Sequence, residues 1–201
     1  MNAKKVFLLL KGEPPKVVPN LSDYNLICAT DGAYGFLKSK NIKPHLICGD
    51  FDSTDIFPEN VEIIATPDQE FTDFDKALQL LFNRGYKTIH VYGASGKEQD
   101  HFLGNLSVAL KWKNRLDLTF FDNYGRYFLL NENTQLTNCL HKIVSLVPFP
   151  EAHGIITQGL QYPLNKETLT LGSRIGTRNK AIKNEVSITF TEGELFVFVN
   201  D

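Results

Sequence analysis

The segment "GDFDS" at residues 49–53 places two carboxylates one residue apart. It follows directly on the apolar run Leu46–Cys48, which has the composition of a buried strand. One explanation is an ordinary surface turn, because Gly, Asp and Ser all favour turns. The other is a site for a hard divalent cation, which prefers oxygen ligands at close quarters.

Acidic residues also follow three other apolar runs in the first half of the chain. They are Asp31 after residues 26–30, Asp68 and Asp73 after residues 61–65, and Asp100 after residues 88–92. Because ligands of an open parallel sheet bind beyond the carboxyl ends of its strands, we expect these carboxylates along one edge. Carboxylates gathered in this way repel one another unless a cation joins them.

Mg²⁺ is the cation that suits such an edge, since it takes one or two carboxylates and completes its shell with water and substrate phosphates. The turn at residues 93–96, "GASG", offers backbone N–H groups to phosphates. A helix that begins near Asp100 would add the positive end of its dipole. Together these signals predict metal-assisted phosphate chemistry.

The elements that must position these residues are short buried strands that alternate with helices. Two helices are well indicated: one from the N-cap Thr72 to Arg84-Gly85, and one from near Asp100 to Trp112, with Leu103 and Leu106 among its core residues. The expected strands span residues 6–10, 26–30, 46–48, 61–65, 88–92 and 118–121. This alternation is typical of a parallel sheet with crossover helices.

Beyond about residue 123 the helical pattern gives way to short β-prone segments separated by Gly and Asn turns. The expected strands there span residues 127–130, 143–148, 154–158, 168–171, 185–190 and 195–199. We therefore predict an α/β protein in two domains. Residues 1–130 form a Rossmann-like parallel sheet with crossover helices, and residues 131–201 form a small all-β sandwich.

Composition excludes several classes of function. The net charge of −2 leaves no basic surface for nucleic acid and no polybasic tract for a membrane. The five-residue apolar run Val6–Leu10 is too short for a signal peptide or a membrane span. Three cysteines, an odd number, indicate reduced thiols and hence a cytoplasmic protein. The histidines show no zinc-ligand spacing, and the sequence contains no Walker-type phosphate loop.

Seven short segments occur in a distinctive order along most of the chain. They are "DGA" at 31–33, "GDFDS" at 49–53, "PDQEFTDFDKAL" at 67–78, "GASGKEQDHFLGN" at 93–105, "GLQYPL" at 159–164, "GTRN" at 176–179 and "GELFVF" at 193–198. In sequence and spacing they resemble the motifs of the thiamine pyrophosphokinases. The resemblance implies an α/β catalytic domain followed by a β-sandwich, in a homodimer with substrate sites near the subunit interface. It also implies transfer of pyrophosphate from ATP to the hydroxyl of thiamine, with Mg²⁺, giving thiamine diphosphate and AMP.

The resemblance assigns roles in the catalytic domain by position. Asp50, Asp52 and Asp73 would hold Mg²⁺ and the nucleotide phosphates, with Asp31 supporting this acidic cluster. The residues that would contact or position the phosphates are Ser53, Gln69, Thr72 and Lys76. Lys76 lies on the polar side of its expected helix, and without the resemblance it reads as a solvated charge.

The resemblance assigns three further residues to thiamine. Asp100 and His101 match an Asp-His pair of the family, which places Asp100 near the aminopyrimidine ring. Asn179 would help to form the thiamine pocket from the β domain.

The sequence departs from the family pattern in two places. Lys97 and Glu98 stand where Gly-Arg is usual, and Arg178 stands where Ser is usual. A Lys offers phosphates a point charge in place of the bidentate contact of an Arg. Arg178 either repels cationic thiamine or points away from it. Two alternatives therefore stay open: a phosphohydrolase that uses the same carboxylates with water as acceptor, and a non-catalytic module that binds thiamine or a nucleotide.

Overall fold

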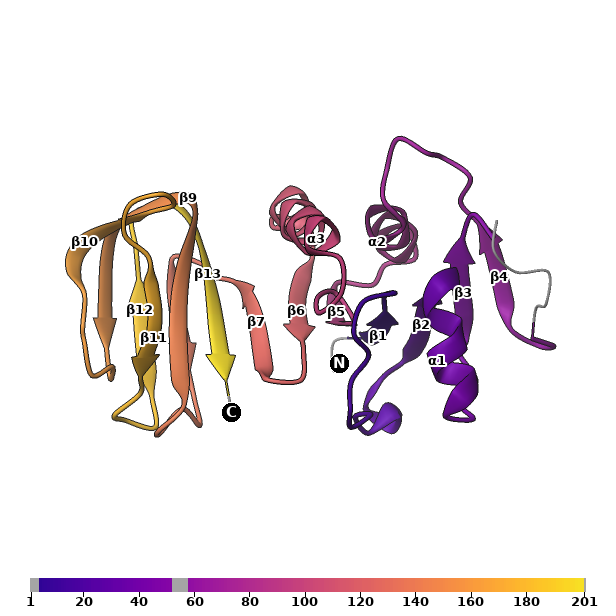
Figure 1. Ribbon diagram of the computed structural model, residues 1–201, viewed down its shortest axis with the longest axis horizontal. Coiled ribbons are helices and arrows are strands. Elements are labelled where there is room, and N and C mark those ends of the chain that lie inside the picture. The colour runs from indigo at the N-terminus through magenta and orange to yellow at the C-terminus, as the bar shows by residue number, and fades with distance from the viewer. Residues whose placement is uncertain (1–3, 52–57, 201) are drawn as a thin grey trace. The chain divides into compact units, whose positions relative to one another are not determined.

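The computed structural model of the chain describes residues 4–51 and 58–200. The chain divides into two compact units, Met1–Asn123 and Tyr124–Asp201. Helices occur in the first unit, and both units contain extended sheet (Figure 1). The chain is thus mixed α/β with much sheet and few helices, which confirms the class predicted from the alternating pattern.

The first unit is built on a parallel sheet with the strand order β4-β3-β2-β1-β5-β6. Its strands are β1 (Lys5–Leu9), β2 (Leu26–Thr30), β3 (Leu46–Gly49), β4 (Glu62–Ala65), β5 (Thr88–Tyr92) and β6 (Asp117–Phe121). The central strands β1, β2 and β3 are almost wholly buried, because they are apolar on both faces. The strand order reverses between β1 and β5, and in open α/β sheets the ligand crevice lies beyond such a reversal.

Backbone hydrogen bonds continue past the ends of β1 and β5. Gly12 N–H donates to Gly93 O at 2.8 Å, and Glu13 N–H donates to Ser95 O at 2.7 Å. A Cβ atom on Gly12 would lie 2.3 Å from Gly93 O, so only glycine permits this close approach. The two loops are thereby held together beyond the carboxyl edge of the sheet.

The helices of this unit are α1 (Tyr34–Ser39), α2 (Asp73–Asn83) and α3 (Gln99–Trp112), with short 3-10 turns η1 (Leu21–Asp23) and η2 (Asp31–Ala33). The predicted start of α2 is confirmed, since Thr72 Oγ1 accepts the N–H of Asp75 at 3.3 Å. The prediction for Leu103 of α3 is wrong: its side chain is 57% exposed. The buried face of α3 instead centres on Ala109 and Trp112, which lie on the other side of Leu106 around the helix.

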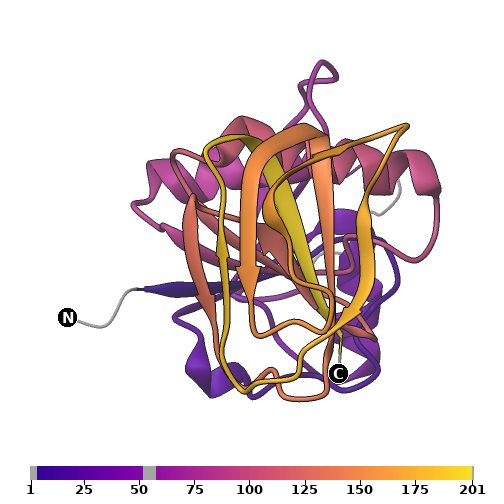
Figure 2. The ribbon, with the colours of Figure 1, turned by 90° about the vertical axis from the view of Figure 1, so that its left-hand side faces the viewer.

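The second unit is all β, and its strand pairs are antiparallel. Its strands are β7 (Gly125–Leu129), β8 (Asn133–Leu136), β9 (Ile143–Gln158), β10 (Asn165–Thr170), β11 (Gly176–Lys180), β12 (Val186–Thr189) and β13 (Glu192–Asn200). The long strand β9 pairs with β10, β11, β12 and β13, and these strands face the viewer in Figure 2. The apolar core of the second unit includes Leu146, Ile155, Ile188 and Val197.

The strand β9 differs from the sequence prediction of two separate strands at 143–148 and 154–158. Pro148 and Pro150 suggest a break, because proline has no N–H for a ladder. The chain stays extended across them because partner strands pair on both sides: Pro148 lies opposite Leu195 of β13, and Glu151 lies opposite Thr170 of β10.

Candidate active site

The carboxylate of Asp31 packs directly against the end of β3. A Cβ atom on Gly49 would lie 2.3 Å from Asp31 Cγ, so a side chain at position 49 would displace this carboxyl group. Asp31 Oδ2 accepts the N–H of Phe51 at 3.1 Å, and Oδ1 accepts the N–H of Gly32 at 2.6 Å. Phe51 has φ of 59°, a left-handed conformation that is strained for an aromatic residue. The hydrogen bond from Phe51 to Asp31 therefore helps to hold the residue after Asp50 in a conformation it would not otherwise prefer.

Lys76 is mostly buried and links two residues of the loop between β4 and α2 to the first residue of α2. Its Nζ donates to Thr66 O at 2.8 Å and to Asp68 O at 3.0 Å, and lies 2.9 Å from Asp73 Oδ1. The side chain is only 9% exposed, so the reading of Lys76 as a solvated charge is wrong. Its charge is instead fixed beside the first turn of α2.

Gln69 connects this loop to the end of β3. Its Nε2 lies 3.4 Å from Asp50 Oδ2 and 3.4 Å from Pro67 O. Asp68 Oδ1 accepts the N–H of Glu70 at 2.8 Å, which closes a tight turn next to Gln69. The structure thus brings Asp31, Asp50, Gln69, Thr72, Asp73 and Lys76 to one edge of the sheet.

Asp100 and His101 are exposed in the first turn of α3. Asp100 Oδ1 accepts the N–H of His101 at 2.9 Å, and His101 Nε2 lies 3.9 Å from Glu98 Oε2. The adjoining turn at 93–96 is tied to this helix, because Asn105 Nδ2 donates to Ala94 O at 2.8 Å. These contacts are local: they hold the turn at 93–96 and the start of α3 together, and they do not connect Asp100 or His101 with Asp50 or Asp73.

Asn179 belongs to the second unit, where it joins two of the sequence motifs. Its Nδ2 donates to Tyr162 O at 2.6 Å, and its Oδ1 accepts the N–H groups of Tyr162 at 3.1 Å and Lys180 at 2.9 Å. The amide therefore fixes "GTRN" against "GLQYPL". Arg178 beside it is exposed, with φ of 57°, and its N–H donates to Ser145 Oγ at 2.8 Å.

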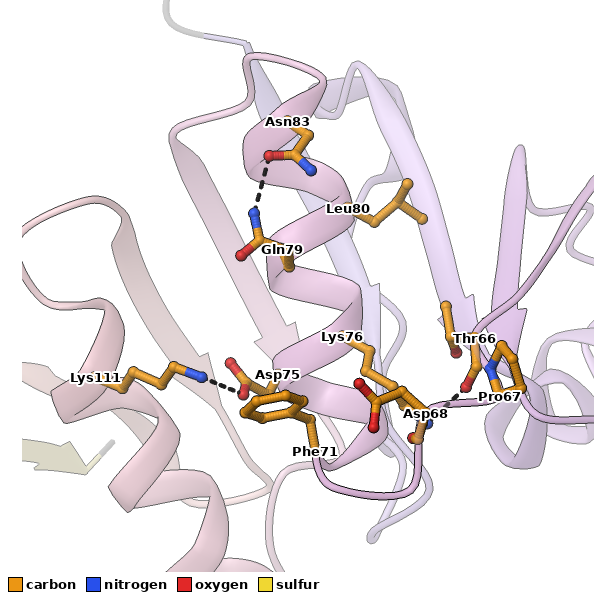
Figure 3. A pocket seen from close by; sticks show the side chains of 10 residues that line it. All are labelled: Thr66, Pro67, Asp68, Phe71, Asp75, Lys76, Gln79, Leu80, Asn83 and Lys111. Atoms are coloured by element: carbon orange, nitrogen blue, oxygen red, sulfur yellow. Dashed lines mark hydrogen bonds and ion pairs between the residues drawn. The ribbon is translucent and has the colours of Figure 1, made fainter.

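Sequence reasoning missed a buried carboxylate and a groove next to these residues. Asp75 is 6% exposed, and it accepts hydrogen bonds of 2.6 Å from Trp112 Nε1 and from Lys111 Nζ. Its signal in the sequence was weak: an Asp directly after Phe74, on the apolar face of α2. The groove, of about 460 Å³, is drawn in Figure 3 and is lined by Thr66, Pro67, Asp68, Phe71, Asp75, Lys76, Gln79, Leu80, Asn83 and Lys111.

The donors available to a metal ion at this edge are carboxylate oxygens, which suit Mg²⁺. Asp52 and Ser53, two of the predicted site residues, lie outside the described residues. In the ranges 4–51 and 58–200, no group of three or more His, Cys, Asp or Glu side chains is arranged to hold a metal ion by itself.

Comparison with known protein families covers both units. The family model described as "Thiamin pyrophosphokinase, catalytic domain" matches residues 19–120. The model described as "Thiamin pyrophosphokinase, vitamin B1 binding domain" matches residues 130–195. The chain belongs to the thiamine pyrophosphokinase family.

Relatives in the family match over nearly the whole chain. The thiamine pyrophosphokinase of Bacillus subtilis is 28% identical, over 96% of this chain and 97% of its own. Thiamin pyrophosphokinase 1 of Caenorhabditis elegans is 27% identical, over 95% of this chain and 87% of its own. The resemblance seen in the seven motifs is therefore confirmed.

Solved structures of thiamine pyrophosphokinases share the fold. The crystal structure from Bacillus subtilis superposes with a TM-score of 0.82 at 24% identity, covering 98% of this chain and 99% of that one. The yeast enzyme gives a TM-score of 0.84 at 16% identity, covering 100% of this chain and 87% of that one. At such identities the likeness establishes the fold, while the family assignment rests on the two domain matches.

Membership of the thiamine pyrophosphokinase family assigns the chain to the transferases that move a pyrophosphoryl group from ATP to thiamine. At Lys97, one of the departures from the family pattern, the structure shows what the side chain contacts. Lys97 Nζ donates to Lys11 O at 2.7 Å, so it braces the loop after β1.

No helix in the described part of the chain is long and apolar enough to cross a membrane.

Proposed function

We propose that this chain transfers pyrophosphate from ATP to the hydroxyl of thiamine in an Mg²⁺-dependent reaction, giving thiamine diphosphate and AMP. The observation that carries the proposal is the contact network of Lys76. Its ammonium group joins Asp73 to the loop that holds Gln69, and Gln69 in turn contacts Asp50. An ammonium group and carboxylates on one edge provide charge of both signs for a magnesium–nucleotide complex.

The proposed chemistry depends on positioning and charge neutralisation. The thiamine oxygen attacks the β-phosphorus, its bond to phosphorus forms, and the bond from the β-phosphorus to the oxygen of the α-phosphate breaks, so that AMP leaves with the electron pair. Lys76 stabilises charge on the phosphate oxygens, and the first turn of α2 presents backbone N–H groups to the same anion. A carboxylate of this edge accepts the hydroxyl proton.

The residues proposed to hold Mg²⁺ are Asp50, Asp52 and Asp73. When bound, the ion neutralises charge on the nucleotide phosphates. Asp31 acts on Asp50 through the backbone of Phe51. Ser53, Gln69, Thr72 and Lys76 are proposed to contact or orient the phosphates.

Thiamine is proposed to bind to Asp100, His101 and Asn179. Asp100 carries negative charge that attracts the thiamine cation and can accept hydrogen bonds from its aminopyrimidine. Asn179 is proposed to shape the pocket by fixing the backbone of Tyr162.

The same proposal covers domains, assembly and location. Residues 1–130 act as a Rossmann-like catalytic domain that binds ATP and Mg²⁺, and residues 131–201 act as a sandwich for thiamine binding and dimerisation. A homodimer is supported by large apolar side chains that are exposed in the second unit, namely Leu140, Tyr162, Leu171, Ile175 and Ile182. A cytoplasmic location is supported by three buried cysteines that are not joined in disulfides.

The test is to incubate the pure protein with Mg²⁺, ATP and thiamine, and to follow AMP and thiamine diphosphate by chromatography beside a reaction without thiamine. We expect AMP only in the presence of thiamine, in an amount equal to thiamine diphosphate. Release of phosphate without thiamine would favour a phosphohydrolase. Nucleotide or thiamine binding without any product would favour a binding module.

A further inference from the structure

Asp75 is the one buried carboxylate among the residues that the structure describes, and the proposed reaction gives it no role. A carboxylate removed from water is strongly destabilising unless hydrogen bonds and an opposite charge compensate it. Asp75 has both, in the indole N–H of Trp112 and the ammonium group of Lys111, each at 2.6 Å. Trp112 is 1% exposed, so its N–H would be unsatisfied without this acceptor.

The position of Asp75 on α2 connects it to the proposed phosphate site. It lies in the first turn of the helix, between Asp73 and Lys76 in sequence. Its own N–H donates to the capping hydroxyl of Thr72. The carboxylate therefore attaches to α3 the same turn that presents Asp73 and Lys76.

Lys111 extends this attachment to the loop before α2. Its Nζ contacts Asp75 Oδ2 and also lies 4.4 Å from the centre of the Phe71 ring (Figure 3). Phe71 stands between Gln69 and Thr72 in the chain, so two adjacent residues of α3 hold both the loop and the first turn. A cation over an aromatic face adds a modest attraction even where both groups are partly exposed.

We propose that Asp75 is a positioning residue for the phosphate-binding turn: through Trp112 and Lys111 it fixes the rotation of α2 about its own axis, so that Asp73 and Lys76 face the nucleotide. This inference rests on the proposed function. An apolar side chain at position 75 would pack on the same face of α2 but would not select one rotation. Two hydrogen bonds of fixed direction do select one.

The expected sensitivity follows from helix geometry. Side chains reach about 5–6 Å from the helix axis, so a rotation of roughly 15° moves their ends by about 1.5 Å. A misplacement of about 1 Å at a reacting centre costs on the order of 100-fold in rate. A small rotation of α2 is therefore sufficient to reduce turnover while the fold persists.

The test compares variants at the two ends of α2. Asp75→Leu removes both hydrogen bonds, Asp75→Asn keeps an acceptor for Trp112, and Trp112→Phe removes the donor. The control is Arg84→Met at the other end, where Arg84 Nη1 and Nη2 bind Glu62 at 2.7 and 2.6 Å. All are assayed at a temperature where circular dichroism shows them folded, with kcat and KM measured separately for magnesium–ATP and for thiamine.

We expect Asp75→Leu and Trp112→Phe to lower kcat/KM for ATP by about 10- to 100-fold, with KM for thiamine within about twofold of wild type. Asp75→Asn should keep most of the wild-type kcat/KM for ATP, because its side-chain oxygen still accepts the Trp112 N–H. Arg84→Met should leave both KM values unchanged. The proposal is overturned if Asp75→Leu only lowers the melting temperature, as Arg84→Met does, and keeps wild-type kinetics.

Two further measurements keep the outcome decisive. If Asp75→Leu does not fold, Trp112→Phe and Asp75→Asn provide the same comparison. If the wild-type protein makes no thiamine diphosphate, the proposed function has failed separately, and affinity for magnesium–ATP by calorimetry becomes the readout. Weaker affinity in Trp112→Phe than in Arg84→Met then supports the positioning role, and equal affinity overturns it.

Discussion

Lys76 Nζ lies 2.9 Å from Asp73 Oδ1 and is almost entirely buried against the loop from β4 to α2. Residues three apart on a helix face each other, so the sequence of α2 alone allows this pair. Its surroundings differ from those of a surface pair, because the same ammonium group also binds the carbonyls of Thr66 and Asp68. The loop between β4 and α2 is thus folded around a buried cation, which is the group proposed above to act on the phosphates.

Replacing Lys76 should impair both turnover and stability. Lys76→Met should lower kcat/KM for ATP by about 100-fold or more, because it removes the positive charge that is proposed to act on the phosphates. It should also lower the melting temperature, since the carbonyls of Thr66 and Asp68 lose their donor. Coupled assays of AMP release and thermal unfolding measure the two effects. The control is Lys38→Met on the exposed part of α1, which should change neither, and an active Lys76→Met protein would contradict the proposed site.

A methyl group at position 49 should disturb the site through Asp31. Gly49→Ala would place Cβ 2.3 Å from Asp31 Cγ, so the carboxyl group must move and release the N–H of Phe51. We expect a loss of about 1–3 kcal/mol in the free energy of unfolding and a clear fall in activity. Gly35→Ala on α1 is the matched control, because nothing lies within 4 Å of its new Cβ. Denaturant titration of both variants checks this, and equal stabilities would refute the packing argument.

Metal removal should stop the reaction and leave the fold intact. With EDTA in excess we expect no AMP or thiamine diphosphate, and full recovery when Mg²⁺ is returned. The near-ultraviolet circular dichroism should not change, because both units contain buried apolar cores that involve no metal. Asp50→Asn should raise the Mg²⁺ concentration required for half-maximal activity, since it removes one charged ligand. Turnover in EDTA would disprove the metal dependence.

The buried thiols should react slowly in the native protein. The pKa of Cys28 is raised well above its usual range by a hydrogen bond with Cys48 and by burial. The reactive thiolate therefore forms in the fold only at a higher pH than in the unfolded chain. Iodoacetamide at pH 8 should label Cys28 only after denaturation, as peptide mass spectrometry would report.

The same pKa shift has a consequence for stability. Above the ordinary thiol pKa, Cys28 of the unfolded chain loses its proton while Cys28 of the folded protein keeps it. The free energy of unfolding should therefore decline as the pH rises from the ordinary thiol pKa toward the raised pKa of Cys28. A Cys28→Ala variant should show less of this alkaline decline. Rapid labelling of Cys28 in the native state would argue against both statements.

Local patterns were sufficient to predict much of the first unit. Thr72 caps α2 because its hydroxyl precedes the apolar helical face and accepts an N–H of the first turn. This interaction involves only residues that are neighbours in the chain, so the sequence is enough to predict it. The strands β1, β2 and β3 were evident because strands covered on both faces are apolar throughout. The helix α1 was missed, because six residues that include Gly35 are too few to display a helical period.

The sequence by itself determined which residue types are available at the strand ends and, through the ordered motifs, the family. The tertiary structure decided their surroundings. Lys76 and Asp75 are adjacent and equally polar in sequence, yet each is buried, one by the carbonyls of the β4–α2 loop and the other by Trp112 and Lys111 of α3. Likewise β9 runs through two prolines because its partner strands hold both halves extended. Burial and pairing depend on segments far away in the chain, which no local pattern contains.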